Sequence, residues 1–328
     1  MTTFFATLTP MLTLFLCIAI GFTLSKTKIL SDGASKTMAK LETWVFCPAL
    51  NFVTMIRYCT LDNLSTNITN VLMATLVVLL ALAIAIPLSR VFVKEKGCER
   101  GVYSYALAFG NCGYIGDPVV LALFGDSILA YYKIFCLPLQ LVIYTWGISV
   151  MIPQEKAGGS TLRRLLNAPT VAMLLGIVLG LSGLGGYLPA FATSALDSLK
   201  ACMGPVAMLL AGATVARYDL VGMLKNKKVY IATALRLVFI PAFLIAVLFG
   251  VGALLDFCPG ISIGRDHLYL CFFAMAAPLG LNTVVFPEAY GGNPETGASM
   301  ALISHTLCII SIPLLYALMT TVFGVPFV

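Results

Sequence analysis

Two short stretches of the chain combine side-chain amides with helix-breaking residues. Residues 110–118 read Gly-Asn-Cys-Gly-Tyr-Ile-Gly-Asp-Pro, and residues 278–285 read Pro-Leu-Gly-Leu-Asn-Thr-Val-Val. Glycine costs a helix about 1 kcal/mol and proline about 3 kcal/mol, so both stretches predict an interrupted helix. The predicted helix-breaking residues are Gly113, Gly116, Pro118, Pro278 and Gly280. Asn111 and Asn282 lie beside these breaks, and an asparagine amide can donate to a carboxylate and accept from a hydroxyl.

The composition of the chain places these stretches in a membrane. Of the 328 residues, 60% are hydrophobic and 10% are charged, whereas a soluble domain carries roughly 45–50% and about 25%. The mean hydropathy of +0.98 predicts a polytopic integral membrane protein and argues against soluble, disordered and disulfide-stapled classes. The net charge of +6 comes without a dense basic run, so no nucleic-acid partner is expected. The ten cysteines are scattered and form no Cys-x-x-Cys motif, so we expect no metal or redox site.

Ten apolar stretches are long enough to cross a membrane as helices, which takes about 20 residues. They cover residues 4–24, 40–57, 69–92, 101–124, 127–151, 168–188, 191–214, 229–254, 268–290 and 298–324. The first is expected to be a permanent span, because Lys26 and Lys28 follow it, whereas a signal peptide has its basic residues in front. The spans predict an all-α fold, with a five-helix repeat over 1–151, a cytoplasmic loop over 152–167 and a second five-helix repeat over 168–328.

Lysine and arginine are distributed unequally between alternate gaps, and an excess of them marks the cytoplasmic side. One side receives Lys26, Lys28, Lys36, Lys40, Arg90, Lys94, Lys96, Arg100, Lys156, Arg163, Arg164, Arg217, Lys225, Lys227 and Lys228. The other side receives only Arg57 and Arg265. The central loop is therefore predicted to be cytoplasmic, with both termini outside the cell membrane.

The two halves of the chain carry matching features, which indicates an ancient duplication. An odd number of spans in each half forces the second copy to be inverted in the membrane. Pro48 and Pro205 lie 157 residues apart, and Val119 and Val284 lie 165 residues apart, so the offsets nearly agree. Inverted repeats with interrupted helices at matching positions are typical of secondary transporters. A glycine-lined groove for helix packing is the alternative interpretation of the breaks.

Interrupted helices in the fourth and ninth spans are expected to cross near the middle of the membrane. The N-termini of their second halves would then direct partial positive charge at one volume, which favours an anion. Asn111 and Asn282 are the first predicted substrate-binding residues. Asn51 and Gln140 are further amides within apolar spans and are candidates for the same volume, with helix–helix hydrogen bonding as the alternative.

Five ionisable side chains within the spans are candidates for coupling or charge balance, because such groups are costly in lipid. They are Asp117, Lys133, Arg236, Glu288 and His305. Asp117 is either a proton-coupling group or a fixed ion-pair partner, with Lys133 as the first candidate partner and Arg236 as the second. Both cations are also candidates to attract an anionic substrate. Glu288 alternatively reaches the membrane interface, and His305 is alternatively a packed polar residue rather than a proton relay.

Two further charged residues lie on the seventh predicted span. Asp197 and Lys200 are three residues apart, which places them on one face of a helix. We expect them to form a local ion pair.

At these positions the chain resembles a known family. Residues 110–118 resemble the Asn-Gly-Gly-Pro signature of the auxin efflux carrier family, prokaryotic branch, and residues 278–285 resemble its second signature. Further similar stretches are 48–50, 204–212, 236–241, 290–292 and 298–313. The similarity runs end to end and includes the short central loop. Asp117 and His305 depart from the family pattern, which commonly has an apolar residue and a small residue there.

The resemblance implies ten helices in two inverted five-helix repeats, related to bile-acid and sodium/proton carriers. It implies a scaffold domain of helices 1, 2, 6 and 7 that mediates homodimer formation. A transport domain of helices 3–5 and 8–10 would hold the crossing helices and move like an elevator. The family's crossover prolines match Pro118 and Pro278, and its crossover asparagine matches Asn111. Members of the family move organic anions, including auxin in plants and malate-type acids in bacteria.

The chain is therefore predicted to be a secondary carrier of a small organic anion, not an enzyme, and to need no cofactor. It has no nucleotide-binding motif, so the energy is expected from H⁺ or Na⁺ coupling or from the membrane potential alone. Its expected partners are the anion, membrane lipid and a second copy of the chain. Two other classes were weighed: a membrane sensor or receptor on a carrier fold, and an intramembrane aspartyl protease. The protease motif Gly-x-Gly-Asp fits Gly116 and Asp117 but has Tyr114 in place of its first glycine.

Overall fold

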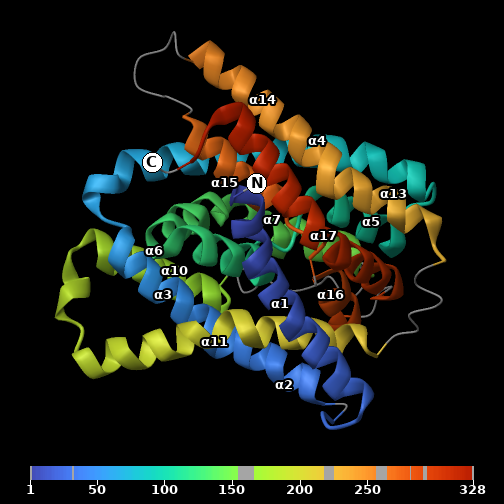
Figure 1. Ribbon diagram of the computed structural model, residues 1–328, viewed down its shortest axis with the longest axis horizontal. Helices are drawn as coiled ribbons and strands as arrows, with labels where there is room; N and C mark the ends of the chain where they lie inside the picture. The colour runs from blue at the N-terminus through green and yellow to red at the C-terminus, as the bar shows by residue number, and fades with distance from the viewer. Residues whose placement is uncertain are drawn as a thin grey trace.

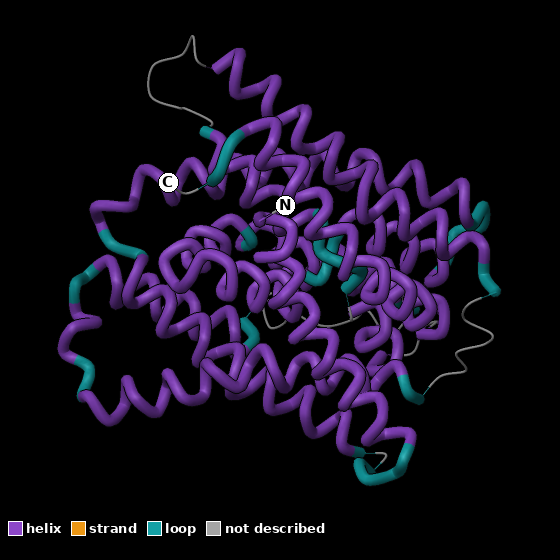
Figure 2. Tube along the Cα trace, in the orientation of Figure 1, coloured by secondary structure: helices purple, strands orange, loops and turns teal. Residues whose placement is uncertain are grey.

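The computed structural model describes residues 2–31, 33–153, 166–217, 225–255, 264–280, 282–290 and 294–326. Within these ranges the regular structure is helical, and a single isolated β-bridge joins Gly110 to Leu279 (Figures 1 and 2). The predicted all-α fold is therefore confirmed. Much of the predicted cytoplasmic loop 152–167, including Lys156, Arg163 and Arg164, lies outside the described residues.

The first half of the chain is a series of long helices joined by short connections. Its elements are α1 (Thr2–Lys26), α2 (Ala34–Leu41), the π-helical turn η1 (Glu42–Phe46), α3 (Cys47–Tyr58), the 3₁₀ turn η2 (Leu61–Asn63), α4 (Leu64–Phe92), α5 (Cys98–Ala108), the π-helical turn η3 (Cys112–Gly116), α6 (Asp117–Phe135), α7 (Leu137–Val142), the π-helical turn η4 (Ile143–Gly147) and α8 (Ile148–Met151).

The second half repeats this organisation. Its elements are α10 (Ala168–Leu181), the 3₁₀ turn η5 (Leu184–Tyr187), α11 (Ala190–Val215), α13 (Lys227–Ala234), the π-helical turn η6 (Leu235–Phe239), α14 (Ile240–Leu255), α15 (Arg265–Met275), α16 (Asn282–Tyr290) and α17 (Pro294–Phe323).

Six described helical stretches are long and apolar enough to cross a membrane, judged by length and composition. They are Leu8–Lys26, Leu61–Phe92, Cys112–Phe135, Ala190–Val215, Lys227–Leu254 and Glu295–Phe323. Two shorter apolar helices, Leu137–Met151 and Ala168–Leu181, fall in the predicted fifth and sixth spans. The predicted second span is occupied by α2, η1 and α3, and the predicted ninth span is divided between α15 and α16. A count of ten crossings stays a prediction.

The interruptions lie close to where the glycines and prolines predicted them. In the second half, the helix is interrupted between Met275 and Asn282, around Pro278 and Gly280. In the first half, the break is shorter than predicted, because it covers only residues 109–111. Gly113 and Gly116 belong to the π-helical turn η3. Pro118 lies where η3 continues into α6, and the break at 109–111 contains none of Gly113, Gly116 and Pro118, so the prediction that these three residues interrupt the helix is wrong.

A sharp turn inside α6 separates the predicted fourth and fifth spans. Gly125 has φ +78° and ψ −174°, a left-handed conformation that glycine adopts without the steric cost of a side chain. The residues before and after it are helical. The predicted boundary between residues 124 and 127 therefore coincides with the observed reversal of the chain.

The helix packing brings distant parts of the sequence together. In the lower part of Figure 1, α1 packs along α11 and α3 packs along α10. A β-carbon added to Gly212 would lie 1.9 Å from the carbonyl oxygen of Ile18, and one added to Gly21 would lie 2.2 Å from that of Leu209. Small residues allow such close approach of membrane helices.

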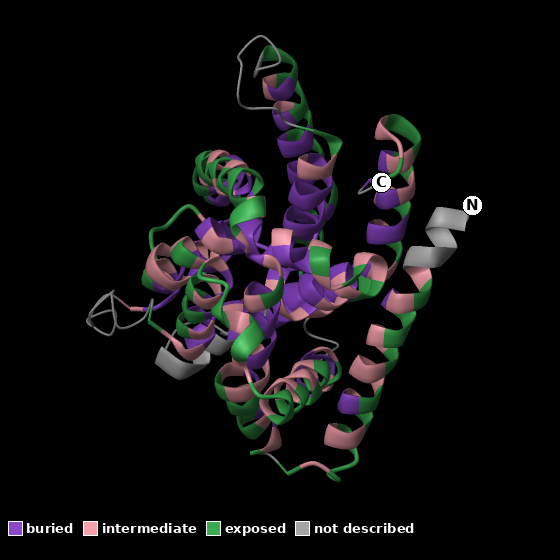
Figure 3. Cartoon of the chain, turned by 90° about the vertical axis from the view of Figure 1, so that its left-hand side faces the viewer, coloured by how far each residue is buried: buried purple, intermediate pink, exposed green. Residues whose placement is uncertain are grey.

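The outer faces of the helices expose large apolar side chains, whereas the interior is densely buried (Figure 3). Leu16 on α1, Leu79 on α4 and Leu314 on α17 are 61%, 60% and 58% exposed. Apolar surface of this extent is costly in water and suits the hydrocarbon core of a bilayer.

Candidate functional site

The two helix breaks meet each other inside the molecule. Gly110 and Leu279 form the antiparallel bridge, and the backbone N–H of Asn111 donates to the carbonyl oxygen of Pro278 at 2.6 Å. The N–H of Leu279 donates to the hydroxyl of Ser304 on α17 at 3.1 Å. The N–H of Asn111 thus finds its partner in the other break and the N–H of Leu279 finds one on α17, as backbone in a membrane requires.

A cavity lies beside this meeting point. It is lined by Thr43, Cys47, Asn51, Gly110, Asn111, Cys112, Gly113, Tyr114, Lys133, Gln140, Ile143, Tyr144, Pro169, Met203, Gly280 and Asn282. The four amides that were predicted to share one volume all line it. The space open to water-sized molecules is about 70 Å³, which is enough for several waters. A β-carbon added to Gly113 would meet no atom within 4 Å, so the backbone borders open space there.

The hydrogen bonds of the amides determine what each can offer a ligand. Asn111 accepts a hydrogen bond from the N–H of Tyr114 at 3.1 Å through Oδ1, which caps η3. Its Nδ2 is buried and has no partner among the described residues. Asn51 donates from Nδ2 to the carbonyl oxygen of Pro169 at 3.0 Å, and its buried Oδ1 has no partner there. One wall therefore presents an unused donor and another an unused acceptor.

Asn282 and Gln140 complete the set of amides. Asn282 is the first residue of α16, and its Nδ2 donates to the hydroxyl of Tyr105 at 3.0 Å. Gln140 lies on α7 and is partly exposed. The helix–helix hydrogen bond that was the alternative for Asn51 is present, since Pro169 lies on α10, and it coexists with a place in the cavity wall.

Asp117 and Lys133 form a buried ion pair. The ammonium group of Lys133 bonds to Oδ2 of Asp117, and the two side chains are 2% and 1% exposed. Lys133 was the first partner predicted for Asp117, and it also lines the cavity. The carboxylate lies where η3 continues into α6, so Lys133 is its described charged partner there.

Arg236, the second predicted partner of Asp117, makes no such pair. Its side chain is fully buried in η6, and its three nitrogens have no hydrogen-bond partner among the described residues. It lies beside Gly110, outside the cavity wall. The prediction of an Asp117–Arg236 pair is therefore wrong, because Lys133 already neutralises that carboxylate.

His305 does not line the cavity beside the helix breaks. His305 on α17 contacts the carbonyl oxygen of Ala301 through Nδ1 at 2.6 Å, and its Nε2 has no partner in the described part of the chain. It lines a separate cavity of about 200 Å³ bordered by α1 and α11. Glu288 belongs to α16, but its side chain lies outside what the structure describes.

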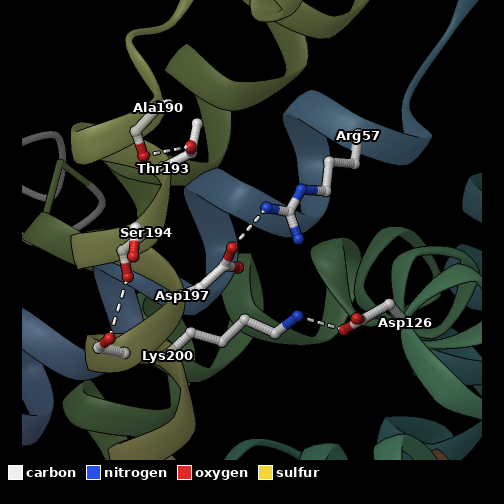
Figure 4. Close-up of polar contacts among 8 residues, drawn as sticks. Arg57, Asp126, Ala190, Thr193, Ser194, Asp197 and Lys200 are labelled. Atoms are coloured by element: carbon white, nitrogen blue, oxygen red, sulfur yellow. Dashed lines mark hydrogen bonds and ion pairs between the residues drawn. The ribbon is translucent and has the colours of Figure 1, made fainter.

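The predicted local pair of Asp197 and Lys200 is wrong. Asp197 accepts from Arg57 on α3 at 2.7 Å, and Lys200 bonds to Asp126 on α6 (Figure 4). Figure 4 shows the two side chains of α11 reaching in different directions toward these partners. Each finds an opposite charge on another helix, which a comparison of positions within one helix cannot anticipate.

Glu42 was not predicted as a candidate and has no exposed surface. Both of its carboxyl oxygens lack a hydrogen-bond partner among the described residues. It begins η1, next to Thr43, which lines the cavity. The signal that could have identified it is an acidic residue inside the predicted span 40–57.

A comparison with protein-family models identifies the chain by sequence. The model described as membrane transport protein matches residues 6–160 and 157–316. The chain belongs to the auxin efflux carrier family of membrane transport proteins. Comparison with curated proteins gave no match. All residues that line the cavity of this membrane transport protein fall within the matched segments.

Proposed function

We propose that this membrane transport protein is a secondary active carrier of a small organic anion, which it binds in the cavity beside the meeting helix breaks. The observation that carries the proposal is the buried Nδ2 of Asn111, a hydrogen-bond donor without a partner among the described residues. Leaving a buried donor unsatisfied costs about 1–3 kcal/mol, which a carboxylate oxygen at this position would recover.

The electrostatics of the cavity favour the same ligand. The N-termini of η3 and α16 begin at Cys112 and Asn282, both of which line it. Such helix ends carry partial positive charge and attract anions. The unused Oδ1 of Asn51 calls for a donor on the ligand, such as a hydroxyl or an N–H group. Auxin-like and malate-like acids both combine a carboxylate with such a donor.

The architecture supports alternating access by an elevator movement. In this proposal ten helices form two inverted five-helix repeats. The scaffold domain consists of α1, α2–α3, α10 and α11, which pack on one another, and it forms the homodimer in the cell membrane. The transport domain consists of α4–α8 and α13–α17 and carries the cavity. Both termini lie outside and the central loop is cytoplasmic. The movement draws on H⁺, Na⁺ or the membrane potential.

The test begins with a thermal-stability screen of the purified protein against mono- and dicarboxylates, because a ligand that binds the folded state raises the melting temperature. Asn111→Ala should then weaken binding of the best ligand by about 10- to 100-fold, which corresponds to a lost hydrogen bond to a charged group. Binding is measured by calorimetry.

The matched control is Asn167→Ala. Asn167 caps α10 through a 3.0 Å bond from the N–H of Thr170, just as Asn111 caps η3, but it does not line the cavity. Unchanged affinity in Asn111→Ala, or equal losses in both variants, contradicts the binding site. Binding without substrate flux in proteoliposomes contradicts a carrier and favours a sensor.

A further inference from the structure

Arg236 is a buried cation that has no counter-ion among the described residues. Its side chain has no exposed surface, and Nε, Nη1 and Nη2 all lack hydrogen-bond partners among the described residues. Among the described residues, the ionisable side chains that act on it most are the thiols of Cys112 and Cys271 and the phenols of Tyr105 and Tyr132. None of these is a carboxylate, so another source of negative potential must balance the guanidinium in a membrane.

The ends of the two interrupted helices lie nearest to the guanidinium and can act only through their partial charge, since no guanidinium nitrogen hydrogen-bonds a described carbonyl group. A β-carbon added to Gly110 would lie 2.4 Å from Nη2 of Arg236 and 2.6 Å from the carbonyl oxygen of Ala277. Gly110 follows the last residue of α5 by two positions, and Ala277 follows the last residue of α15 by two. The guanidinium therefore lies near the C-terminal ends of α5 and α15, the helices that precede the two breaks.

The two helix ends carry charge of the sign that a cation needs. The C-terminus of a helix behaves as roughly −0.5 of an elementary charge, through carbonyl groups that have no partner within the helix. Two such ends together match one positive charge. In carriers with broken helices, these carbonyl ends are where Na⁺ or H⁺ is coordinated.

We propose that the Arg236 guanidinium is the resident cation of the crossing point and occupies the place at the carbonyl ends of α5 and α15 that a dissolved cation would otherwise fill. The N-termini of η3 and α16, which face the cavity, then remain available to bind the anion. The cation site is inferred only from the position of the guanidinium beside Gly110 and Ala277. Its consequence, that transport needs no Na⁺ at this position, rests on the proposed function.

Stability measurements test the cation site without any substrate. Arg236→Met keeps most of the length and volume but removes the charge, and Arg236→Lys keeps the charge. If Arg236 holds the carbonyl ends, Arg236→Met lowers the melting temperature by several degrees and Arg236→Lys by much less. If Arg236 is only an uncompensated buried charge, Arg236→Met raises the melting temperature, because the desolvation cost is removed, and the proposal is overturned.

Chemical rescue provides the second measurement. Arg236→Ala leaves a space, and guanidinium chloride far below denaturing concentrations should restore part of the lost melting temperature, compared with choline chloride at equal ionic strength. The control is Arg57→Ala, whose parent side chain is 39% exposed and paired with Asp197, and which should show no such rescue. Absence of rescue in Arg236→Ala contradicts the proposal.

Wild-type protein supplies a measurement that does not depend on any variant folding. Replacing choline chloride by sodium chloride should leave its melting temperature unchanged, whereas a sodium-dependent rise overturns the proposal. This outcome is separate from the proposed function, since a carrier can fail the sodium test and still bind and move an anion, and the cation site can be present in a protein that moves none.

Discussion

The ion pair of Asp117 and Lys133 depends on a turn between them. The two residues are sixteen positions apart, and in one straight helix that separation would place them about 24 Å apart. Gly125, with its left-handed backbone, reverses the chain between them. The pair can therefore form only because α6 turns back on itself, and it also neutralises the charge of Lys133 in the cavity wall.

Breaking this pair should reduce stability rather than alter pH dependence. Removing one partner of a buried ion pair costs about 3–5 kcal/mol, because the other charge remains buried and unpaired. Asp117→Asn is therefore expected to lower the melting temperature strongly, with Lys133→Met in the same chain restoring much of it. Transport assayed from acidic to alkaline pH in the surviving Asp117→Asn protein should keep the wild-type profile. A flat profile would instead make Asp117 the proton-coupling group.

The sequence predicted the partner of Asp117 but not the partners of Asp197 and Lys200. Asn51, Asn111, Gln140 and Asn282 were expected to share one volume, because amides in apolar spans are costly without a purpose, and all four line the cavity. The partners of Asp197 and Lys200 were missed, because they depend on which helices become neighbours. Tertiary packing decides which helices become neighbours, and the spacing of residues along one helix does not predict that packing.

At the scale of elements, the point where the two breaks meet is formed by four helix ends. The helices α5 and α15 end there, and η3 and α16 begin there within a few residues. The glycine and proline content located both interruptions, since these residues weaken a helix wherever they occur. The lengths of the breaks were not predictable. Gly116 fits a helical turn against the hydroxyl of Tyr132, and Pro118 lies where η3 continues into α6, so neither residue ends the helix despite its low helix propensity.

Gly113 tests whether the space beside η3 serves the ligand. Gly113→Ala should fold at least as well as wild type, because its β-carbon meets nothing within 4 Å and alanine favours a helix by about 1 kcal/mol. The added methyl group would narrow the cavity, so ligand affinity should fall about tenfold. Gly250→Ala on α14 also meets nothing within 4 Å and should leave affinity unchanged. Equal affinities in the two variants would place the ligand elsewhere.

At the scale of the whole molecule, α11 carries one ion pair to each of two neighbours. Arg57–Asp197 joins α11 to α3, both in the proposed scaffold, whereas Lys200–Asp126 joins α11 to α6 in the proposed transport domain. An elevator movement leaves the first contact intact and must break the second. The two pairs therefore distinguish a moving domain from a rigid molecule.

Cross-linking across these pairs should separate the two cases. In a cysteine-free background, Asp126→Cys with Lys200→Cys is expected to lose transport when joined by a short bifunctional thiol reagent. Arg57→Cys with Asp197→Cys, joined by the same reagent, should keep it. Flux is measured in proteoliposomes before and after linking, and on the four single variants. Undiminished flux in the linked 126–200 protein would rule out relative motion of α6 and α11.

No described carboxylate pairs with Arg236, and this has an electrical consequence. Asp117 and Lys133 cancel, so these three buried residues together contribute one net positive charge to the proposed moving unit when the cavity is empty and none when it holds a monoanion. A field of 100 mV acts on one charge crossing the membrane with about 2.3 kcal/mol. An inside-negative voltage would then drive the empty unit inward and leave the loaded unit unbiased, which rectifies the cycle toward export. Voltage steps applied without substrate would evoke brief capacitive currents, and saturating monoanion would suppress them.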